Sequence, residues 1–192
     1  MKYCVFETDW GYFALAGTED ELCFTQLPGP DAVAVESLLL GRLAATERKM
    51  AGRAGASRDL ESLQLRSGVR LDSSYFKSVQ EQIRAYFAGQ KVIFDSEILL
   101  NFGSMSDFGR AVLFACRQVG FGQTVTYSTL ARLAGSPGAS RAVGGVMAAN
   151  PMPLLVPCHR VLRSDGGLGG FSAAGGVAVK RRLLDHERRC AG

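Results

Sequence analysis

Cys158 is the residue of this chain with the clearest potential for covalent chemistry. It stands in Pro157-Cys158-His159-Arg160, directly after the apolar run LLV at positions 154–156. A thiolate attacks carbon efficiently only when a nearby imidazole, cation or helix N-terminus lowers the pKa of the thiol. The β-prone run predicts that Cys158 ends a buried strand. Neighbours on an extended chain point to opposite faces, so we expect a water molecule to bridge the thiol and His159.

Glu187 supplies a carboxylate that could complete a three-residue arrangement. It lies in a helix predicted over residues 179–189. In such an arrangement Glu187 orients His159, and His159 accepts the proton of Cys158. A Cys-His dipeptide by itself is more often a buried structural thiol beside a hydrogen-bonded core histidine. The wider sequence must therefore distinguish the two interpretations.

The other cysteines indicate reduced thiols. They stand at positions 4, 23, 116 and 190 with no CxxC pair, and the chain has only two histidines. An odd cysteine count without a signal peptide is typical of a cytoplasmic protein, and no apolar run approaches the roughly 20 residues that span a bilayer. We expect no cofactor, no membrane association and no metal, because zinc needs clustered ligands. Cys4 and Cys23 together with carboxylates are the only candidates for a metal site.

Positive charge is concentrated in the C-terminal half. Residues 1–100 carry 11 Lys and Arg against 14 Asp and Glu, a net charge of −3, whereas residues 101–192 carry 11 against 4, a net charge of +7. A basic face can neutralise nucleic-acid phosphates, although many proteins have one without binding nucleic acid. The charge alone thus favours a nucleic-acid partner only slightly.

Residues 1–95 have the pattern of a small α/β domain. β-prone runs predict strands at 3–6, 12–15, 22–27 and 91–94, and apolar spacing predicts helices over 31–50 and 74–88. The polar, Gly- and Arg-rich stretch 51–70 is interpreted as a mobile connection. A boundary is expected near 96–106, and we divide the domains after residue 95.

Residues 96–192 contain a candidate helix-turn-helix. Helices are predicted over 107–119, 129–134 and 138–149, with a turn at positions 135–137 between the last two. The third helix is rich in glycine and alanine, and glycine costs about 0.5–1 kcal/mol relative to alanine inside a helix. Either a protein element or a nucleic-acid backbone would have to approach this smooth surface closely. Arg141, its one long cation, favours nucleic acid.

Several motifs in this half resemble the O6-alkylguanine-DNA alkyltransferases. They are PCHRV at 157–161, RAVGGVMAANP at 141–151, FGQTVTY at 121–127, LARLAG at 130–135 and LLDHE at 183–187. The likeness runs from about residue 108 to residue 187, while residues 1–95 have only a compatible pattern. The resemblance implies a ribonuclease H-like α/β domain over 1–95 and a winged-helix, helix-turn-helix domain over 96–192.

The resemblance also implies single-turnover repair of alkylated DNA. Cys158 would irreversibly take an alkyl group from O6 of guanine, or from O4 of thymine, after the base is flipped out of double-stranded DNA that is bound through its minor groove. His159, held by Glu187, would deprotonate Cys158 through water. Tyr127 would help rotate the target nucleotide and donate a proton to guanine. The protein would act as a monomer.

Further residues are implied to contact the substrate or to shape its site. Arg141 would fill the space of the extruded base, and Asn150 would stabilise the turn between the recognition helix and the cysteine strand. Phe171, at a position often occupied by Tyr in the family, and Ser172 would lie in the pocket-wall loop. Met147 and Val161 complete the predicted binding residues.

Three other functions are compatible with parts of the pattern. They are a lesion-binding protein that transfers nothing, a thiol peptidase with a Cys-His-Glu site, and a winged-helix transcription factor. The first has no use for Cys158, and the second leaves the basic helix-turn-helix unexplained. The third would bind undamaged DNA in a sequence-specific manner.

Overall fold

The computed structural model describes residues 1–51 and 68–191, which form two compact units. The first comprises Met1–Ala88 and Ser96–Asn101, and the second comprises Gly89–Asp95 and the chain from Phe102 onward. The chain therefore passes between the units more than once, and the division after residue 95 stays a prediction. Most of the connection expected over 51–70 lies outside the described residues. Within the described ranges, no helix is long and apolar enough to cross a membrane.

A five-stranded mixed sheet forms the centre of the first unit. Its order is β4-β1-β2-β3-β5, and the strands are β1 (Lys2–Thr8), β2 (Gly11–Gly17), β3 (Glu21–Gly29), β4 (Arg70–Leu71) and β5 (Leu99–Leu100). β1 pairs antiparallel with β2, and β2 pairs antiparallel with β3. Gly11 (φ +108°) makes the first turn possible, because a Cβ there would lie 2.3 Å from the carbonyl oxygen of Gly29. The three long strands confirm the sequence prediction.

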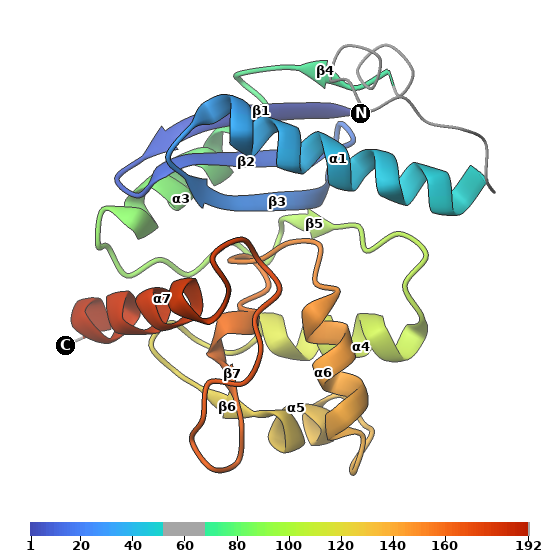
Figure 1. Ribbon diagram of the computed structural model, residues 1–192, viewed down its shortest axis with the longest axis vertical. Coiled ribbons are helices and arrows are strands. Elements are labelled where there is room, and N and C mark those ends of the chain that lie inside the picture. Colours follow the sequence, from blue (N-terminus) through green and yellow to red (C-terminus); the bar gives the residue numbers. More distant parts are fainter. Residues whose placement is uncertain (52–67, 192) are drawn as a thin grey trace. The chain divides into compact units, whose positions relative to one another are not determined.

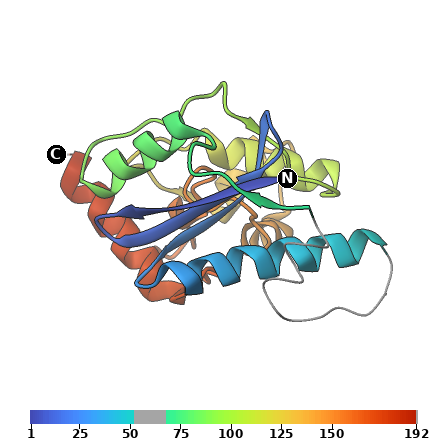
Figure 2. The ribbon, with the colours of Figure 1, turned by 90° about the horizontal axis from the view of Figure 1, so that it is seen from above.

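Helices cover both faces of this sheet (Figures 1 and 2). They are α1 (Ala32–Ala51) and α3 (Lys77–Phe87), which lie on opposite sides of β1 and β2. Ala14 belongs to a buried cluster with Leu39 of α1, whereas the Phe13 ring lies 6.0 Å from that of Phe87 in α3. Successive residues of β2 thus face different helices. This is why the strand is continuously apolar instead of alternating.

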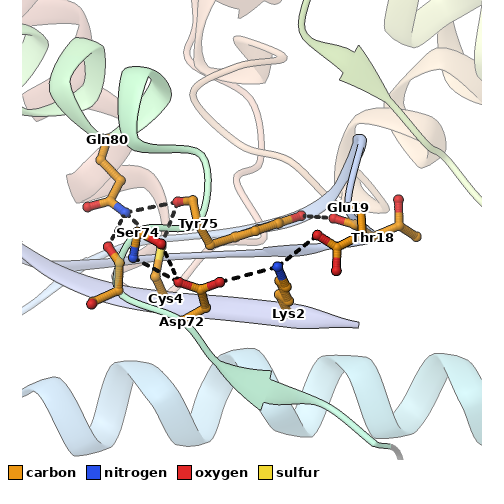
Figure 3. Close-up of polar contacts among 9 residues, drawn as sticks. Lys2, Cys4, Thr18, Glu19, Asp72, Ser74, Tyr75 and Gln80 are labelled. Atoms are coloured by element: carbon orange, nitrogen blue, oxygen red, sulfur yellow. Dashed lines mark hydrogen bonds and ion pairs between the residues drawn. The ribbon is translucent and has the colours of Figure 1, made fainter.

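A hydrogen-bond network fastens the start of α3 to the sheet (Figure 3). Gln80 Nε2 donates to the carbonyl oxygens of Ser73 (2.8 Å) and Tyr75 (2.9 Å) and lies 3.5 Å from the Cys4 sulfur. The Tyr75 hydroxyl donates to the Thr18 carbonyl at 2.8 Å, which ties the same segment to the β2–β3 turn. Burial raises the pKa of the Cys4 thiol to about 12. Cys4 is therefore an unreactive structural thiol.

The strand predicted at 91–94 was wrong. These residues have no strand pairing, and Ile93 is 81% exposed. The strand of this region is β5, which pairs parallel with β3 at Glu21 and Leu22. Strand propensity produces a strand only where a partner is available, and the partner of β5 lies about 80 residues earlier in the chain.

The second unit contains a three-helix core with a small sheet. Its helices are α4 (Asp107–Arg117), α5 (Tyr127–Leu133) and α6 (Ser140–Ala148), followed by the C-terminal α7 (Gly176–Ala191). β6 (Val125–Thr126) pairs parallel with β7 (Val161–Leu162). The Thr126 side chain accepts the backbone N–H of Thr129 and so starts α5 at Tyr127. α5 and α6 form the predicted helix-turn-helix, and α6 begins only after Gly138 (φ +85°).

The segment that carries Cys158 is not a strand, contrary to the prediction. Cys158–Arg160 form a single 3-10 turn, and the two-residue strand β7 comes after it. Leu154 has a left-handed backbone (φ 82°), and the prolines at 153 and 157 have no N–H to donate to a ladder. Asn150 holds the segment instead: its Nδ2 donates to the Val156 carbonyl at 2.9 Å, and its Oδ1 accepts from Met152 N at 3.0 Å.

Candidate active site

A buried cluster of three charged or titratable side chains lies behind the cysteine. His159 Nε2 is 2.7 Å from Glu187 Oε1, so the structure brings together the two residues that the sequence paired. Arg160 adds a bidentate ion pair, with Nη2 2.9 Å from Oε1 and Nε 2.9 Å from Oε2 of the same carboxylate. Gly122 N donates to Oε2 at 3.0 Å, and Arg160 Nη1 donates to the Val119 carbonyl. Glu187 is thus surrounded by donors.

These contacts decide the protonation of the pair. Burial alone would raise the pKa of Glu187, but hydrogen bonds and charges from its neighbours, with Arg160 holding it bidentately, bring this pKa far below its usual value. Burial lowers the pKa of His159 and outweighs the opposing effect of Glu187. The imidazole is therefore neutral beside an ionised carboxylate. It donates its Nε2 hydrogen to Glu187, which leaves Nδ1 as a proton acceptor.

Cys158 is 7% exposed and lies at one wall of a cavity of about 340 Å³. Burial raises the pKa of its thiol, while a hydrogen bond from Asn150 and the positive charge of Lys180 oppose that effect. The thiol is therefore protonated at neutral pH, and a base must remove its proton before it can attack. The backbone of His159 hydrogen-bonds the thiol, but among the described residues no hydrogen bond joins the thiol to the His159 imidazole, whose Nε2 faces Glu187.

Lys180 is a second buried positive charge of the site, after Arg160, and it acts on Cys158. Its side chain is fully buried, its Nζ donates to the Val161 carbonyl at 2.6 Å, and the same nitrogen lies 5.9 Å from the centre of the Tyr127 ring. A buried ammonium group is costly unless it has partners, and here the carbonyl and the aromatic ring provide them. Lys180 thus fixes the end of the 3-10 turn and the nearby tyrosine together.

The cavity wall contains three of the six predicted binding residues, Met147, Phe171 and Ser172. Its lining is formed by Tyr127, Gly144, Met147, Ala148, Cys158, Gly170, Phe171 and Ser172. Ser172 Oγ donates to the Ala148 carbonyl at 2.7 Å, which joins the loop before α7 to the end of α6. Val161 is fully buried and does not line the cavity, so its side chain is placed as a core residue. A volume of this size lies within the range of small-molecule sites, about 300–1,000 Å³.

Two residues of the site were not singled out from the sequence. Arg160 belongs to the same PCHR motif, but its partner Glu187 is 27 positions away. Lys180 had a usable signal, because Lys180, Leu183, Leu184 and Glu187 are buried at helical spacing along α7. A charged residue in such a stripe indicates a buried partner.

The surface of α6 is open in the described structure. A Cβ added at Gly144 or Gly145 would have no described atom within 4 Å. At these two glycines no described element of the protein packs against the helix, so close packing of a protein element does not explain them. Arg141 lies exposed on the same helix. The remaining explanation is the close approach of another molecule.

Two family models match almost the whole chain. The ribonuclease-like domain of the 6-O-methylguanine DNA methyltransferases matches residues 1–100, and the DNA-binding domain of the same proteins matches residues 107–189. Curated relatives carry the name methylated-DNA–protein-cysteine methyltransferase. The mouse protein is 58% identical over 81 residues (42% of this chain, 38% of that protein). The protein of Methanothermobacter thermautotrophicus is 42% identical over 111 residues (58% and 60%).

A longer alignment and a solved structure agree with these matches. The relative from Mycolicibacterium paratuberculosis is 40% identical over 124 residues, which cover 65% of this chain and 72% of that protein. The crystal structure of Mycobacterium tuberculosis OGT in complex with DNA is 27% identical and has a TM-score of 0.72, covering 99% of this chain and 94% of the other. The alignments with the mouse and Methanothermobacter proteins span less than two thirds of those relatives. On both family models together, the chain belongs to the 6-O-methylguanine DNA methyltransferase family.

Proposed function

We propose that this protein reverses O6-alkylation of guanine in double-stranded DNA by irreversible transfer of the alkyl group to Cys158. The observation that carries the proposal is the Cys158 thiol at the wall of a cavity of about 340 Å³, next in the chain to His159, whose Nε2 lies 2.7 Å from Glu187 Oε1. The names of the relatives support the reaction. O4-alkylthymine offers the same displacement chemistry and is the second substrate that we propose.

The transfer is a direct displacement at carbon. His159 Nδ1 takes the thiol proton through a bridging water, and the Cys158 sulfur forms a bond to the alkyl carbon. The carbon–O6 bond breaks, its electron pair passes to guanine, and the Tyr127 hydroxyl donates a proton to the departing base. Return of the proton from His159 to Tyr127 by way of solvent restores both groups. The new carbon–sulfur bond is a stable thioether whose reversal would require a thiolate to leave from carbon, so each molecule reacts once.

Duplex DNA is the partner that we propose for the open face of α6. Glycines without neighbours let a sugar-phosphate backbone approach closely, as in minor-groove binding with insertion of a side chain. Arg141 then replaces the flipped base in the stack. The net charge of +7 in residues 101–192 and the DNA complex of the M. tuberculosis protein support a DNA partner. We propose a monomer that acts on cytoplasmic DNA.

The proposed activity is tested with a duplex that contains one O6-methylguanine. After incubation with a stoichiometric amount of the protein, we expect intact mass analysis to show one added methyl group per molecule, and nucleoside analysis to show restored guanine. An excess of DNA leaves the surplus lesions unrepaired. Tight binding with neither change in mass nor repair contradicts the proposal and makes the protein a lesion sensor.

Replacing Arg141 with alanine is expected to slow transfer from duplex DNA by about 10- to 100-fold. Flipping a base costs a few kcal/mol, each 1.4 kcal/mol corresponds to a factor of ten, and Arg141 would offset that cost by filling the gap. Single-turnover rates on duplex and on single-stranded oligonucleotides provide the control. The single strand has no stack to fill, so an equal loss on both substrates would contradict the assigned role.

The transfer rate is expected to stay constant as the pH falls from 8 to about 6.5 and to decline only below that value. Burial places the pKa of His159 below its ordinary value, so the imidazole remains a base throughout this range. Single-turnover rates measured between pH 5 and 8.5 test this, and an inflection above pH 6.5 would contradict it. The free energy of unfolding should also decrease as the pH falls. Because the unfolded chain takes up the His159 proton first, stability falls as the pH drops below about 6.5.

A further inference from the structure

A second cavity of about 270 Å³ adjoins the one that holds Cys158. The two share Tyr127 and Gly144 in their linings, so they are direct neighbours. The remaining lining is contributed by Ser128 at the start of α5, by Ser140 and Arg141 at the start of α6, and by Arg163 and Ser164 after β7. Elements from three parts of the second unit thus converge on one small space.

The lining of this second cavity is suited to an anion. Its lining includes two arginines, three serines and Tyr127, and no acidic side chain is among its described lining residues. Arginine matches the tetrahedral oxygens of a phosphate through paired N–H donors, and serine hydroxyls are frequent phosphate contacts in DNA complexes. Gly144, which lines both cavities, has no side chain, and a Cβ there would have no described atom within 4 Å.

Backbone hydrogen bonds fix the main chain at Arg163 before any ligand binds. It begins a tight turn in which its N–H donates to the Gly167 carbonyl at 2.8 Å and its carbonyl accepts from Gly166 N at 3.1 Å. Its Nη2 lies 2.8 Å from Asp165 Oδ2, and Gly167 N donates to the other oxygen of Asp165 at 2.9 Å. Both side chains of the ion pair are more than half exposed, so the pair is weak. The remaining guanidinium donors of Arg163 are available to a phosphate.

We propose that this second cavity binds a phosphodiester next to the extruded nucleotide, with Arg163 as the residue that supplies the charge. The inference rests on the proposed function, because it takes the DNA duplex as the ligand. The base would enter the cavity at Cys158 while the phosphodiester that carries it contacts Arg163, and Arg141 would enter the base stack. Arg163 would therefore contribute to affinity for damaged and undamaged duplexes alike, since a phosphate contact carries no base information.

The test compares Arg163→Ala with Arg188→Ala, both in a Cys158→Ala background that leaves the lesion intact. Arg188 is a matched control because it is exposed, pairs with an Asp and lies outside the cavity. For Arg163→Ala we expect duplex binding to weaken about threefold or more, and the slope of log K against log salt to fall by about 0.9. Lesion-containing and undamaged duplexes should lose the same factor. Arg188→Ala should leave the slope unchanged.

Single methylphosphonate linkages locate the contact. One neutral linkage is placed at each position in turn on either side of the lesion, and each duplex is titrated with the protein carrying Arg163 and with the Arg163→Ala protein. At one linkage the losses of binding free energy caused by the methylphosphonate and by Arg163→Ala should not add, because both changes remove the same interaction. Additivity at every linkage, or equal salt slopes for the two arginine variants, overturns the phosphate site. Methyl transfer by the wild-type protein is measured in a separate experiment. A negative result for the phosphate site therefore leaves the proposed function standing, and the two proposals can fail independently.

Discussion

Replacing Cys158 with alanine is expected to abolish methyl transfer while leaving affinity for a lesion-containing duplex within about threefold of wild type. The sulfur atom forms the new bond, so nothing else in the cavity can replace it, whereas the DNA contacts proposed for α6 do not involve it. The rate is measured by loss of label from a methylated duplex, and the affinity by titration. Cys190→Ala, which removes a partly exposed thiol, is the matched control and should transfer at the wild-type rate.

Residual transfer by the Cys158→Ala protein would contradict the assignment of the acceptor. Three of the other cysteines are buried, and burial raises the pKa of each of them. They are therefore poor nucleophiles in the folded protein. Unchanged binding with no transfer would show that recognition and chemistry reside in different residues.

Replacing Glu187 with glutamine is expected to lower both stability and transfer rate. The carboxylate accepts from Arg160, His159 and Gly122. Removing its charge leaves the buried Arg160 without a counter-ion, and breaking a buried ion pair in this way costs about 3–5 kcal/mol. The rate should fall by roughly 10²- to 10⁴-fold, because the neutral amide no longer stabilises the positive charge that His159 gains when it takes the thiol proton. Denaturant unfolding and single-turnover kinetics measure the two effects.

A second variant separates the structural role of Glu187 from its role in proton transfer. Combining Glu187→Gln with Arg160→Met removes the unpaired guanidinium and leaves an amide oxygen to accept from His159. The unfolding free energy should recover in part, since an ion pair replaced by apolar or neutral groups is often tolerated. The transfer rate should stay low. Recovery of the rate together with the stability would mean that Glu187 serves only to neutralise Arg160.

The pairing of His159 with Glu187 could be predicted because it depends on residue types and on one clear helix. A carboxylate at a buried helical position needs a donor, and the histidine beside the cysteine was the available one. The backbone conformation at Cys158 could not be predicted in the same way. An apolar run has the same composition in a strand and in a buried turn, and here Leu154 and the side-chain bonds of Asn150 select the turn.

Contacts between distant residues account for the other differences. β5 has two residues and exists only because Glu21 and Leu22 pair with it, so its own sequence carries little information. The sequence shows that Arg160 is charged, but its burial could not be predicted, because it depends on α7 placing Glu187 beside it. The glycines of α6 are unusual in a helix, and the sequence alone allowed close packing of either a protein element or a nucleic-acid backbone. In the structure no described atom lies within 4 Å of a Cβ added at Gly144 or Gly145, which argues against a protein element.

Peptide mass analysis after a single turnover tests the central claim most directly. The wild-type protein is incubated with a duplex that carries one isotopically labelled O6-methylguanine, digested, and searched for the label on every cysteine-containing peptide. The account predicts one labelled methyl group on the peptide that contains Cys158, unlabelled peptides for Cys4, Cys23, Cys116 and Cys190, and unmodified guanine in the DNA. Label on another cysteine, or repaired DNA with no labelled peptide, would contradict it.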